Sequence, residues 1–588
     1  MPRQVPRRWY ALAESSTGFT PLTDSEGHFA LADHTFTVRR PETEILLLIS
    51  RTSLAPEAAA RLRELLQREL DWPWLLVRSD RHSLYPLLYW HLNASAADLV
   101  PPAWLEFLRD LFRQNVQRSL LLTSELIQVV TQLQNAGITA VPYKGSVLAS
   151  LAYGHLGLRR FQDLDILVRQ SEILRAQEVI FSLGYGTVTG ATPAQIAAGR
   201  IPGQYAYSRT REKILLEVHT ERTLRYFPKP SDFDRLWERL ETMELGGKRI
   251  PTLSPPDLFS FLCIHGTKHL WSRLSWICDI AELAGRQEPS EWLRIRERAT
   301  SYGAERMVVL ALVLARDVLG ASFPPQAAAW IESDSALPAL AQRLHSQIIA
   351  DSPRWPSALE RFLFRVRMRP RLGEGIRYGI RLATMPTEED WNEVQNRGVL
   401  GSAPLALRRL FRLLTKYGLT SQGAAVDGDL AGYEPTPAEI VEKMLEFAEL
   451  RPGDVLYDLG CGDGRVVIQA AKRYGVRAVG VDADPQRIAE ARQNAQRESV
   501  GNLVSFRRKD ARAVDLREAT VVILYLPWAA NLSLRETLHR KLRPGARIVS
   551  RNSGMGDWPP EKTEVVTDST GKQSALFLWH TARPDRRR

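Results

Sequence analysis

The stretch 455-VLYDLGCGDGRVVIQAA-471 decides the fold of the C-terminal part of this 588-residue chain. An apolar run ends at Asp458, and a segment with apolar residues at helical spacing begins at Arg465. The turn between them carries glycines at alternate positions, Gly460, Gly462 and Gly464. Since glycine lets a backbone turn tightly and approach a ligand closely, the stretch predicts a strand, a ligand-binding turn and a helix over 465–474.

The same alternation of strand and helix continues towards the C-terminus. Further helices are expected over 485–498 and 531–542. The expected strands, in chain order, are VLYDLG, AVGVD, VSFRRKD, TVVILYLP and RIVS. Strands that alternate with helices predict a Rossmann-like, doubly wound parallel sheet with helices on both faces.

The ligand of the glycine turn follows from three features that do not suit a dinucleotide. The glycine spacing is GxGxG and not GxGxxG, and Asp458 lies where it would repel a pyrophosphate but suit a cationic ligand. Asp482 ends the second strand and is placed to accept hydrogen bonds from ribose hydroxyls. Asp510 ends the third strand, where a contact with the edge of an adenine belongs. Simple capping of strand ends by these aspartates is the alternative, and Cys461 fits a small filler better than a nucleophile.

Together these residues resemble a class I S-adenosylmethionine-dependent methyltransferase over about residues 430–582. The resemblance implies S-adenosylmethionine as the cofactor. The residues that it places around the cofactor in the strand ends and the glycine turn are Asp458, Gly460, Cys461, Gly462, Gly464, Asp482, Ala483, Asp510 and Ala511.

The segments 433-YEPTP-437, 524-LYLPW-528 and 551-RNSGMGDWPP-560 bear on the methyl acceptor. The middle one lacks the Asn/Asp-Pro-Pro-Tyr/Phe motif of base and glutamine N-methyltransferases. The combination is similar to small bacterial relatives of seven-strand protein-lysine methyltransferases. That resemblance implies that Tyr433, Pro435 and Thr436 fold over the cofactor; a proline-bounded helix start capped by Thr436 is compatible with it.

No residue near the fourth strand is an obvious base for deprotonating a lysine. Methyl transfer from a sulfonium needs an aligned and desolvated nucleophile more than acid–base chemistry. The residues to which we assign positioning of the acceptor are Tyr525, Pro527, Trp528 and Asn531.

A second candidate site begins in the stretch 158-LRRFQDLDILVRQ-170. Asp163 and Asp165 share one face of an expected strand, because side chains alternate with period two. Two carboxylates on one face are either solvated or hold a cation between them, and oxygen ligands of this kind suit Mg²⁺. Glu217, in 213-KILLEVHTE-221, supplies a third carboxylate on a neighbouring strand. The turn Lys144-Gly145-Ser146 offers backbone N–H groups, a hydroxyl and a charge to a phosphate.

This order of a Gly-Ser turn, Asp-x-Asp and a later carboxylate resembles the DNA polymerase β-like nucleotidyltransferases. Over about residues 42–417 the chain is similar to the bacterial "uncharacterised nucleotidyltransferase" family, although Ser146 and Asp163 lie further apart than is usual in the superfamily. The resemblance implies that Asp163 and Asp165 hold Mg²⁺ and a nucleoside triphosphate, and that Glu217 completes a second metal position.

Other polar residues near this candidate site allow more than one interpretation. Arg159 and Arg160 either clamp phosphates or are surface arginines on a turn. His265, Lys268 and His269 lie on one expected helix, and we interpret them first as substrate or phosphate contacts, then as packing, and last as zinc ligands. A site that has lost activity and serves as a binding scaffold is a further alternative.

The predicted organisation is an α/β multidomain chain. Its parts are an N-terminal extension (1–41), an α+β nucleotidyltransferase-like domain (42–417, with its core about 138–250 and a helical region 251–417), a linker (418–432) and a methyltransferase domain (433–588). Within the second part we expect helical structure from about 42 to 135, for example over 56–77 with Pro56 near a helix start, and two helices over 103–137.

Composition and charge restrict the class of protein. Hydrophobic residues make up 44% and charged residues 25%, as in ordinary globular proteins. Three cysteines exclude a disulfide framework and fit a reducing cytosol. The N-terminus has no signal-peptide pattern, and the longest apolar run, 308–319, is interrupted by Arg316 and Asp317 and predicts a buried helix. The net charge is +11, with eight arginines in 354–381, which fits solvated arginine-rich helices better than a nucleic-acid-binding surface.

The sequence therefore predicts a cytoplasmic, bacterial, bifunctional transferase. The C-terminal module would transfer a methyl group, to a protein lysine or a small molecule, and the N-terminal module would transfer a nucleoside monophosphate from its triphosphate to an unknown acceptor. Two alternatives remain: a methyltransferase whose N-terminal half recognises the substrate, or one whose N-terminal half binds nucleic acid through its arginine-rich helices.

Overall fold

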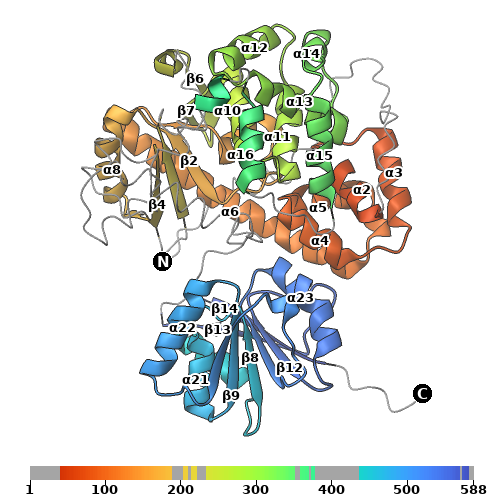
Figure 1. The fold of residues 1–588 in the computed structure, drawn as a ribbon, viewed down its shortest axis with the longest axis vertical. Helices are drawn as coiled ribbons and strands as arrows, with labels where there is room; N and C mark the ends of the chain where they lie inside the picture. Colours follow the sequence, from red (N-terminus) through yellow and green to blue (C-terminus); the bar gives the residue numbers. More distant parts are fainter. Residues whose placement is uncertain are drawn as a thin grey trace. The chain divides into compact units, whose positions relative to one another are not determined.

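The computed structural model describes residues 40–188, 203–209, 214–220, 233–350, 358–369, 373–377, 436–569 and 573–581 (Figure 1). The predicted linker 418–432 and almost all of the predicted extension 1–41 lie outside these ranges. In the part of the chain that is described, no helix is long and apolar enough to cross a membrane.

Helices make up the first part of the described chain. They are α2 (Pro41–Leu48), α3 (Pro56–Leu66), α4 (Trp72–Arg81), α5 (Tyr85–Ser95) and α6 (Pro102–Asn135). The helical pattern over 56–77 is confirmed, with Pro56 as the first residue of α3, but it comprises two helices. Helix α3 ends at Leu66, and the Asp71 side chain caps α4 by accepting a hydrogen bond from the backbone N–H of Trp74 at 3.0 Å. The two helices expected over 103–137 are wrong: α6 runs unbroken for 34 residues and stops before Gly137, which has φ +72°.

A five-stranded mixed sheet follows, in the order β1-β2-β5-β4-β3. Its strands are β1 (Val141–Pro142), β2 (Asp163–Leu167), β3 (Gly186–Thr187), β4 (Gln204–Arg209) and β5 (Ile214–His219). The central strands β2 and β5 are parallel, with Asp165 opposite Glu217, and β4 is antiparallel to β5. Between β1 and β2 lie α7 (Gly145–Leu148) and the π-helical turn η2 (Ala149–Tyr153), and α8 (Ile173–Ser182) follows β2.

The hairpin of β6 (Glu241–Leu245) and β7 (Lys248–Thr252) leads into a second helical group. Its helices are α10 (Pro255–Lys268), α11 (Leu274–Ala284), α12 (Glu291–Ser301), α13 (Glu305–Leu319), α14 (Pro325–Ile331), α15 (Leu337–Ile349) and α16 (Ala358–Arg367). The buried helix predicted from the apolar run 308–319 is confirmed, since α13 buries every residue from Met307 to Ala315.

The C-terminal module is built on a seven-stranded sheet in the order β10-β9-β8-β11-β12-β14-β13 (Figure 1). The strands are β8 (Val455–Leu459), β9 (Arg477–Asp482), β10 (Val504–Arg508), β11 (Val521–Leu524), β12 (Arg547–Arg551), β13 (Lys562–Thr567) and β14 (Gln573–His580). The first five in chain order are parallel, as predicted; β13 and β14 form an antiparallel hairpin that the sequence did not predict.

Helices cover both faces of this sheet. Helices α20 (Ala438–Phe447), α21 (Arg465–Tyr474) and α22 (Pro485–Arg497) pack on one face, and α23 (Trp528–Lys541) packs on the other. The helix predicted over 465–474 matches α21, and α22 ends one residue before its predicted bound. Helix α23 starts at Trp528, three residues before the predicted 531, because Pro527 serves as its N-cap.

A buried ion pair joins the start of this sheet to the end of α20. The Arg547 guanidinium donates to both carboxylate oxygens of Asp454 at 2.6 Å and also contacts the carbonyls of Ala448 and Glu449. Asp454 in turn accepts from the Thr520 hydroxyl at 2.6 Å, so one charge pair fixes three segments of the chain.

We expect Arg547→Met to lower the free energy of unfolding by about 3–5 kcal/mol, because it leaves the Asp454 carboxylate buried without its cation. Urea unfolding of the full chain, followed by the fluorescence of the C-terminal module's tryptophans, measures the change. The control is Arg477→Met, which removes an exposed pair with Glu518 and should change stability by less than about 1 kcal/mol. Equal effects of the two substitutions would contradict the role given to the buried pair.

Candidate active sites

The glycine turn after β8 adopts a backbone conformation that other residues rarely take. Gly460, Gly462 and Gly464 all have positive φ, at +92°, +52° and +82°. A Cβ atom on Gly460 would lie 2.6 Å from Leu526 Cδ2, and one on Gly464 would lie 2.8 Å from the Phe506 ring. The turn therefore needs glycine for its conformation and also for its close packing.

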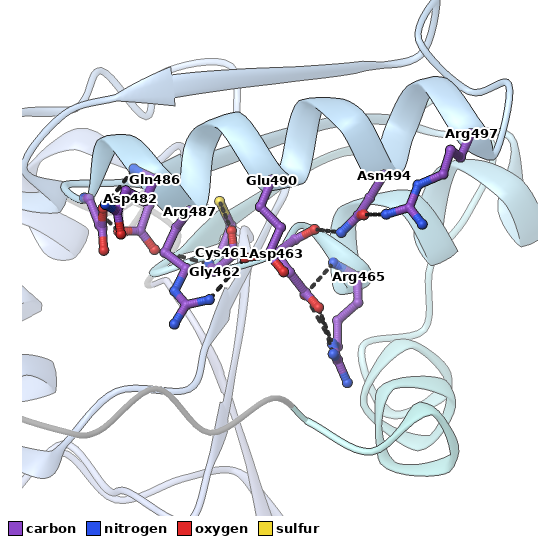
Figure 2. Close-up of polar contacts among 11 residues, drawn as sticks. Cys461, Gly462, Asp463, Arg465, Asp482, Gln486, Arg487, Glu490, Asn494 and Arg497 are labelled. Atoms are coloured by element: carbon purple, nitrogen blue, oxygen red, sulfur yellow. Dashed lines mark hydrogen bonds and ion pairs between the residues drawn. The ribbon is translucent and has the colours of Figure 1, made fainter. Parts of the chain in front are cut away.

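Asp482, at the end of β9, fixes the turn to the neighbouring strand (Figure 2). Its Oδ2 accepts from the backbone N–H of Gly462 at 3.0 Å, and its Oδ1 accepts from the N–H of Asp484 at 2.9 Å. Asp484 then caps α22 by accepting from the N–H of Gln486 at 2.7 Å. The carboxylate is thus held rigidly at the carboxyl edge of the sheet, beside the turn.

Asp463 orients the outer side of the turn. Its carboxylate pairs with Arg465, and its carbonyl accepts from the Asn494 side chain at 2.8 Å (Figure 2). The Arg465 guanidinium also donates to the carbonyl of Thr436 at 2.8 Å, so it links the turn to the segment that precedes α20.

Asp458, the predicted contact for a cationic ligand, is buried at the end of β8. Burial, and after it the negative charges of Asp482 and Asp463, raise the pKa of Asp458 to about 8. Three carboxyl groups therefore lie close together at this edge of the sheet, and a cationic ligand beside Asp458 would favour its ionised form.

The other residues predicted for the cofactor lie around the same edge. Asp510 follows β10 and pairs with Arg512 at 2.5 Å, and Ala511 opens the short 3-10 turn Ala511–Ala513 beside it. Ala483 is exposed next to Asp482, whereas Cys461 is buried with its Sγ close to Gly480.

The segment predicted to fold over the cofactor is described only from Thr436 onwards; Tyr433 and Pro435 lie outside the described residues. Thr436 is buried. The alternative in which Thr436 caps the next helix is wrong, because Pro437 is the N-cap of α20 and no side chain caps it.

The four residues predicted to position the acceptor do not all face the same place. Tyr525 is half-buried just after β11, and Pro527 and Trp528 begin α23. Asn531 is fully buried, and its side-chain amide donates to the Ser550 hydroxyl at 2.9 Å and to the Ser553 carbonyl at 3.1 Å. Asn531 therefore ties α23 to the end of β12 and does not face an acceptor directly.

The carboxylates predicted in the N-terminal module line one cavity of about 460 Å³. Asp163 and Asp165 come from β2, and Glu217 comes from the parallel strand β5, directly opposite Asp165. The backbone therefore places these carboxylates on two neighbouring strands, as the sequence predicted.

Asp165 is the most strongly paired of the three carboxylates. Its Oδ1 accepts from Lys144 Nζ at 2.9 Å and lies 2.8 Å from His219 Nε2. Burial alone would raise the pKa of Asp165, but the Lys144 charge and the His219 hydrogen bond outweigh it and hold the pKa well below its usual range. Asp163 goes the other way, since burial and the charge of Asp165 raise its pKa.

His219 joins these carboxylates to make a group that fits a divalent cation. One ligand atom from each of Asp165, Glu217 and His219 lies within 4.8 Å of the others. Two oxygens and an imidazole nitrogen form a donor set for Mg²⁺ or a transition metal. His219 was not predicted from the sequence, although its position two residues after Glu217 puts it on the same strand face.

The predicted phosphate-binding turn is only partly open to this cavity. Lys144 and Gly145 line it, but Ser146 does not: its side chain is fully buried and its Oγ accepts from the Thr123 hydroxyl of α6 at 2.9 Å. The Ser146 hydroxyl is thus engaged inside the protein, contrary to its predicted contact with a phosphate.

Arg159 and Arg160 also line the cavity and are not exposed surface arginines. Arg159 makes a two-fold contact with Asp279, at 2.8 and 3.0 Å, and Arg160 pairs with Asp80 at 2.5 Å. Both guanidiniums are therefore held in place by buried carboxylates beside the acidic strands.

Helix α10 contributes the opposite wall, with the predicted residues His265, Lys268 and His269. The two imidazole rings lie 4.8 Å apart and both pack near the Trp276 ring. Burial, and then neighbouring cations, lower the pKa of both histidines, that of His269 to about 3, so both rings are neutral at physiological pH.

Comparisons with known proteins divide the chain in the same way as its sheets. The family model described as "Uncharacterised nucleotidyltransferase" matches residues 68–320, and the one described as "ANTKMT methyltransferase domain" matches residues 458–562. A protein-lysine N-methyltransferase of Saccharolobus islandicus is 41% identical over 137 residues, which are 23% of this chain and 85% of that protein. The chain belongs to this methyltransferase family.

Two further matches fall on the same module. The adenine nucleotide translocase lysine N-methyltransferase of Mus musculus is 36% identical over 24% of this chain and 60% of its own length. Among solved structures, an RNA methyltransferase from Salinibacter ruber in complex with S-adenosyl-L-homocysteine is 42% identical, covering 26% of this chain and 98% of that one, with a TM-score of 0.24.

The C-terminal module is thus an S-adenosylmethionine-dependent methyltransferase, and its residues fit that cofactor. The neighbouring carboxyls of Asp458 and Asp482 suit a ligand with a sulfonium and an ammonium group, because such a ligand favours the ionised form of Asp458. Glycine at 460 and 464 also lets the turn pack closely against Leu526 and Phe506 beside the strand end.

We expect S-adenosylmethionine to bind more tightly as the pH rises from 6 to about 8, and then at a constant affinity. The Asp458 carboxyl, with its raised pKa, is neutral below about pH 8 in the free protein, and only its ionised form balances the cofactor's positive charge. Binding at pH 7 should therefore release protons, which calorimetry in buffers of different ionisation enthalpy measures. The pH dependence should disappear in Asp458→Asn; proton uptake on binding, or an unchanged slope in the variant, would refute this role.

Proposed function

We propose that the C-terminal module, residues 433–588, methylates lysine side chains of a protein. The observation that carries the proposal is the 41% identity to a protein-lysine N-methyltransferase over 85% of that protein's length. The mouse relative, also a lysine N-methyltransferase, supports the same class of acceptor.

The residues at the sheet edge suit this chemistry. When bound, S-adenosylmethionine supplies an activated methyl group on a sulfonium. In our proposal Asp458 balances the cofactor's positive charge, and Asp482 accepts hydrogen bonds from its ribose. The glycine turn with Cys461, the segment Tyr433–Thr436, and the residues Ala483, Asp510 and Ala511 enclose the rest.

The acceptor amine needs alignment and dehydration at the same edge. Tyr525, Pro527 and Trp528 follow β11, directly beside the strand that ends in Asp458. They would form the wall along which a lysine side chain enters. Asn531 would act indirectly, because its hydrogen bonds hold the 550–553 segment against α23.

Asp482→Ala should weaken the binding of S-adenosylmethionine by about 100-fold, since it removes the ribose contacts and the anchor of the Gly462 N–H. Titration calorimetry measures the affinity. Transfer of a tritiated methyl group into cell-lysate protein, with modified lysines located by mass spectrometry, measures the activity.

The control is Asp515→Ala, an exposed aspartate of the same module that pairs with Arg517 and should change neither quantity. Label in RNA in place of protein would overturn the proposed acceptor while leaving the methyltransferase assignment intact. Unchanged binding by Asp482→Ala would overturn the proposed cofactor contact.

We also propose that the N-terminal module, residues 42–417, transfers a nucleoside monophosphate from a triphosphate, and that residues 418–432 link it to the methyltransferase. The match of residues 68–320 to a nucleotidyltransferase family model and the cavity with Asp163, Asp165 and Glu217 support this second function. Bound Mg²⁺ would neutralise phosphate charge there, since phosphoryl transfer is mainly a matter of charge and alignment.

The chain's own residues have distinct parts in this proposal. Asp165, Glu217 and His219 would hold one divalent cation, and Asp163 would share it or hold a second. Lys144, which lines the cavity and pairs with Asp165, would add its positive charge beside the phosphates. Arg159, Arg160 and the backbone of Gly145 and Ser146 would lie along the triphosphate.

Asp163→Asn should reduce Mg²⁺-dependent transfer of an α-³²P-labelled nucleotide to protein or small-molecule acceptors by at least about 100-fold, because it misplaces the cation and the reacting phosphate. Incubation with each of the four nucleoside triphosphates and cell extract measures the transfer. Asp110→Asn, an exposed α6 residue near Arg113, is the matched control and should transfer normally.

Wild-type protein that transfers no label, but still methylates, would contradict a catalytic N-terminal module and favour a substrate-recognition scaffold. Binding of RNA or DNA that falls steeply with salt would instead favour the nucleic-acid-binding alternative.

A further inference from the structure

Arg551 is the last residue of β12, and its side chain is fully buried. Its Nε donates to the Ser574 hydroxyl at 3.1 Å. Its Nη1 and Nη2 atoms have no hydrogen-bond partner within the part of the chain that the structure describes. The Tyr525 ring lies 4.3 Å from the guanidinium carbon and stacks on it.

Among the described residues, no negative charge neutralises the positive charge of this buried guanidinium. The guanidinium stays charged at all ordinary pH values, and a buried charge without an anionic partner is strongly unfavourable. A Tyr ring offsets part of that penalty but accepts no hydrogen bond from Nη1 or Nη2 in the plane of the guanidinium.

Arg547, on the same strand, is a buried arginine whose charge and hydrogen bonds are satisfied by other residues of the protein. It lies four residues earlier on the same face, and its guanidinium meets both Asp454 oxygens and two carbonyls. Arg551 has the same burial, but the described residues offer it no such anion, which points to a bound ligand as the source of one.

The position of Arg551 indicates which ligand this is. Asp458 on β8 pairs with Ile523 on β11, and Ile523 pairs with Val549 on β12, so Asp458, Val549 and Arg551 face the same side of the sheet. Two strand spacings, roughly 10 Å, separate β8 from β12. The side chains of Asp458 and Arg551 can close that distance around the ammonium and carboxylate of one amino acid.

We propose that Arg551 binds the α-carboxylate of S-adenosylmethionine. Asp458 then faces the positive groups of the cofactor's amino-acid end, and Arg551 faces its one negative group. Arg551 acts as a cofactor-binding residue that distinguishes cofactors with a carboxylate from those without one. This inference rests on the use of S-adenosylmethionine by the C-terminal module, and not on the identity of the acceptor.

The test compares S-adenosylmethionine with decarboxylated S-adenosylmethionine, which keeps the sulfonium, the ammonium, the ribose and the adenine. We expect the wild-type full chain to bind the complete cofactor at least about 30-fold more tightly, as measured by titration calorimetry. Equal affinities would overturn this inference alone, whereas failure of both compounds to bind would overturn the cofactor assignment itself.

Two variants assign the discrimination to Arg551. Arg551→Met should bind the two compounds within about threefold of each other, and Arg551→Lys, which keeps a charge, should restore part of the preference. The Met variant should also have a thermal midpoint at or above that of the wild type without ligand, because it removes an unpaired buried charge. Added S-adenosylmethionine should raise that midpoint less than in the wild type.

Other outcomes would contradict this role of Arg551. If Arg551→Met retains the wild-type preference, the carboxylate binds elsewhere. If the variant binds both compounds as the wild type does but loses methyl transfer, Arg551 faces an anionic group of the acceptor. Should the Met variant fail to fold, the wild-type comparison and the Lys variant still decide the question.

Discussion

The buried carboxyl of Asp458 needs a positive partner, and this requirement governs what the C-terminal module can bind. The group lies at the end of β8, close to the charges of Asp482 and Asp463, with its pKa raised to about 8. A pyrophosphate would add to the repulsion, whereas a sulfonium and an ammonium relieve it. The rest of the edge is held in place around it: the glycines let the turn pack tightly, and Asp482 accepts hydrogen bonds from two backbone N–H groups.

In the N-terminal module, the protein's own side chains neutralise the charge of a buried carboxylate. Asp165 is buried as deeply as Asp458, but Lys144 and His219 neutralise it directly, and its pKa lies below the usual range. Its carboxylate is therefore ionised before any ligand arrives. In the proposed nucleotidyltransferase, a divalent cation would therefore meet a carboxylate that is already ionised and already paired with Lys144.

Much of the C-terminal fold could be predicted because its signals are local. The strand that ends in Asp458, the glycine turn and the helix 465–474 are contiguous, and helix α21 has the bounds that the apolar spacing predicts. Strand β13 was missed because most of its side chains are exposed, whereas β14, with buried Leu576, Leu578 and Trp579, could have been found from its apolar residues. In the N-terminal module, the long helix α6 and the break between α3 and α4 depend on tertiary packing and on the Asp71 cap, which outweigh local propensity.

In the candidate sites, too, the sequence predicted what local patterns determine and missed contacts between distant segments. Asp163, Asp165 and Glu217 could be brought together from strand periodicity alone, and His219 could have been found by the same rule. The engagement of Ser146 by Thr123, of Arg159 by Asp279 and of Arg160 by Asp80 joins residues far apart in sequence, so no local pattern predicts it. The unpaired guanidinium of Arg551 likewise becomes visible only when its surroundings are known.

The central claim is that the charged groups at the carboxyl edge of the seven-stranded sheet bind one S-adenosylmethionine. A crystal structure of the full chain with S-adenosyl-L-homocysteine tests it most directly. We predict ribose hydroxyls within hydrogen-bond distance of Asp482, the cofactor's ammonium towards Asp458 and its carboxylate on Arg551. A cofactor bound away from Asp482, or with no group close to Asp458, would contradict the account.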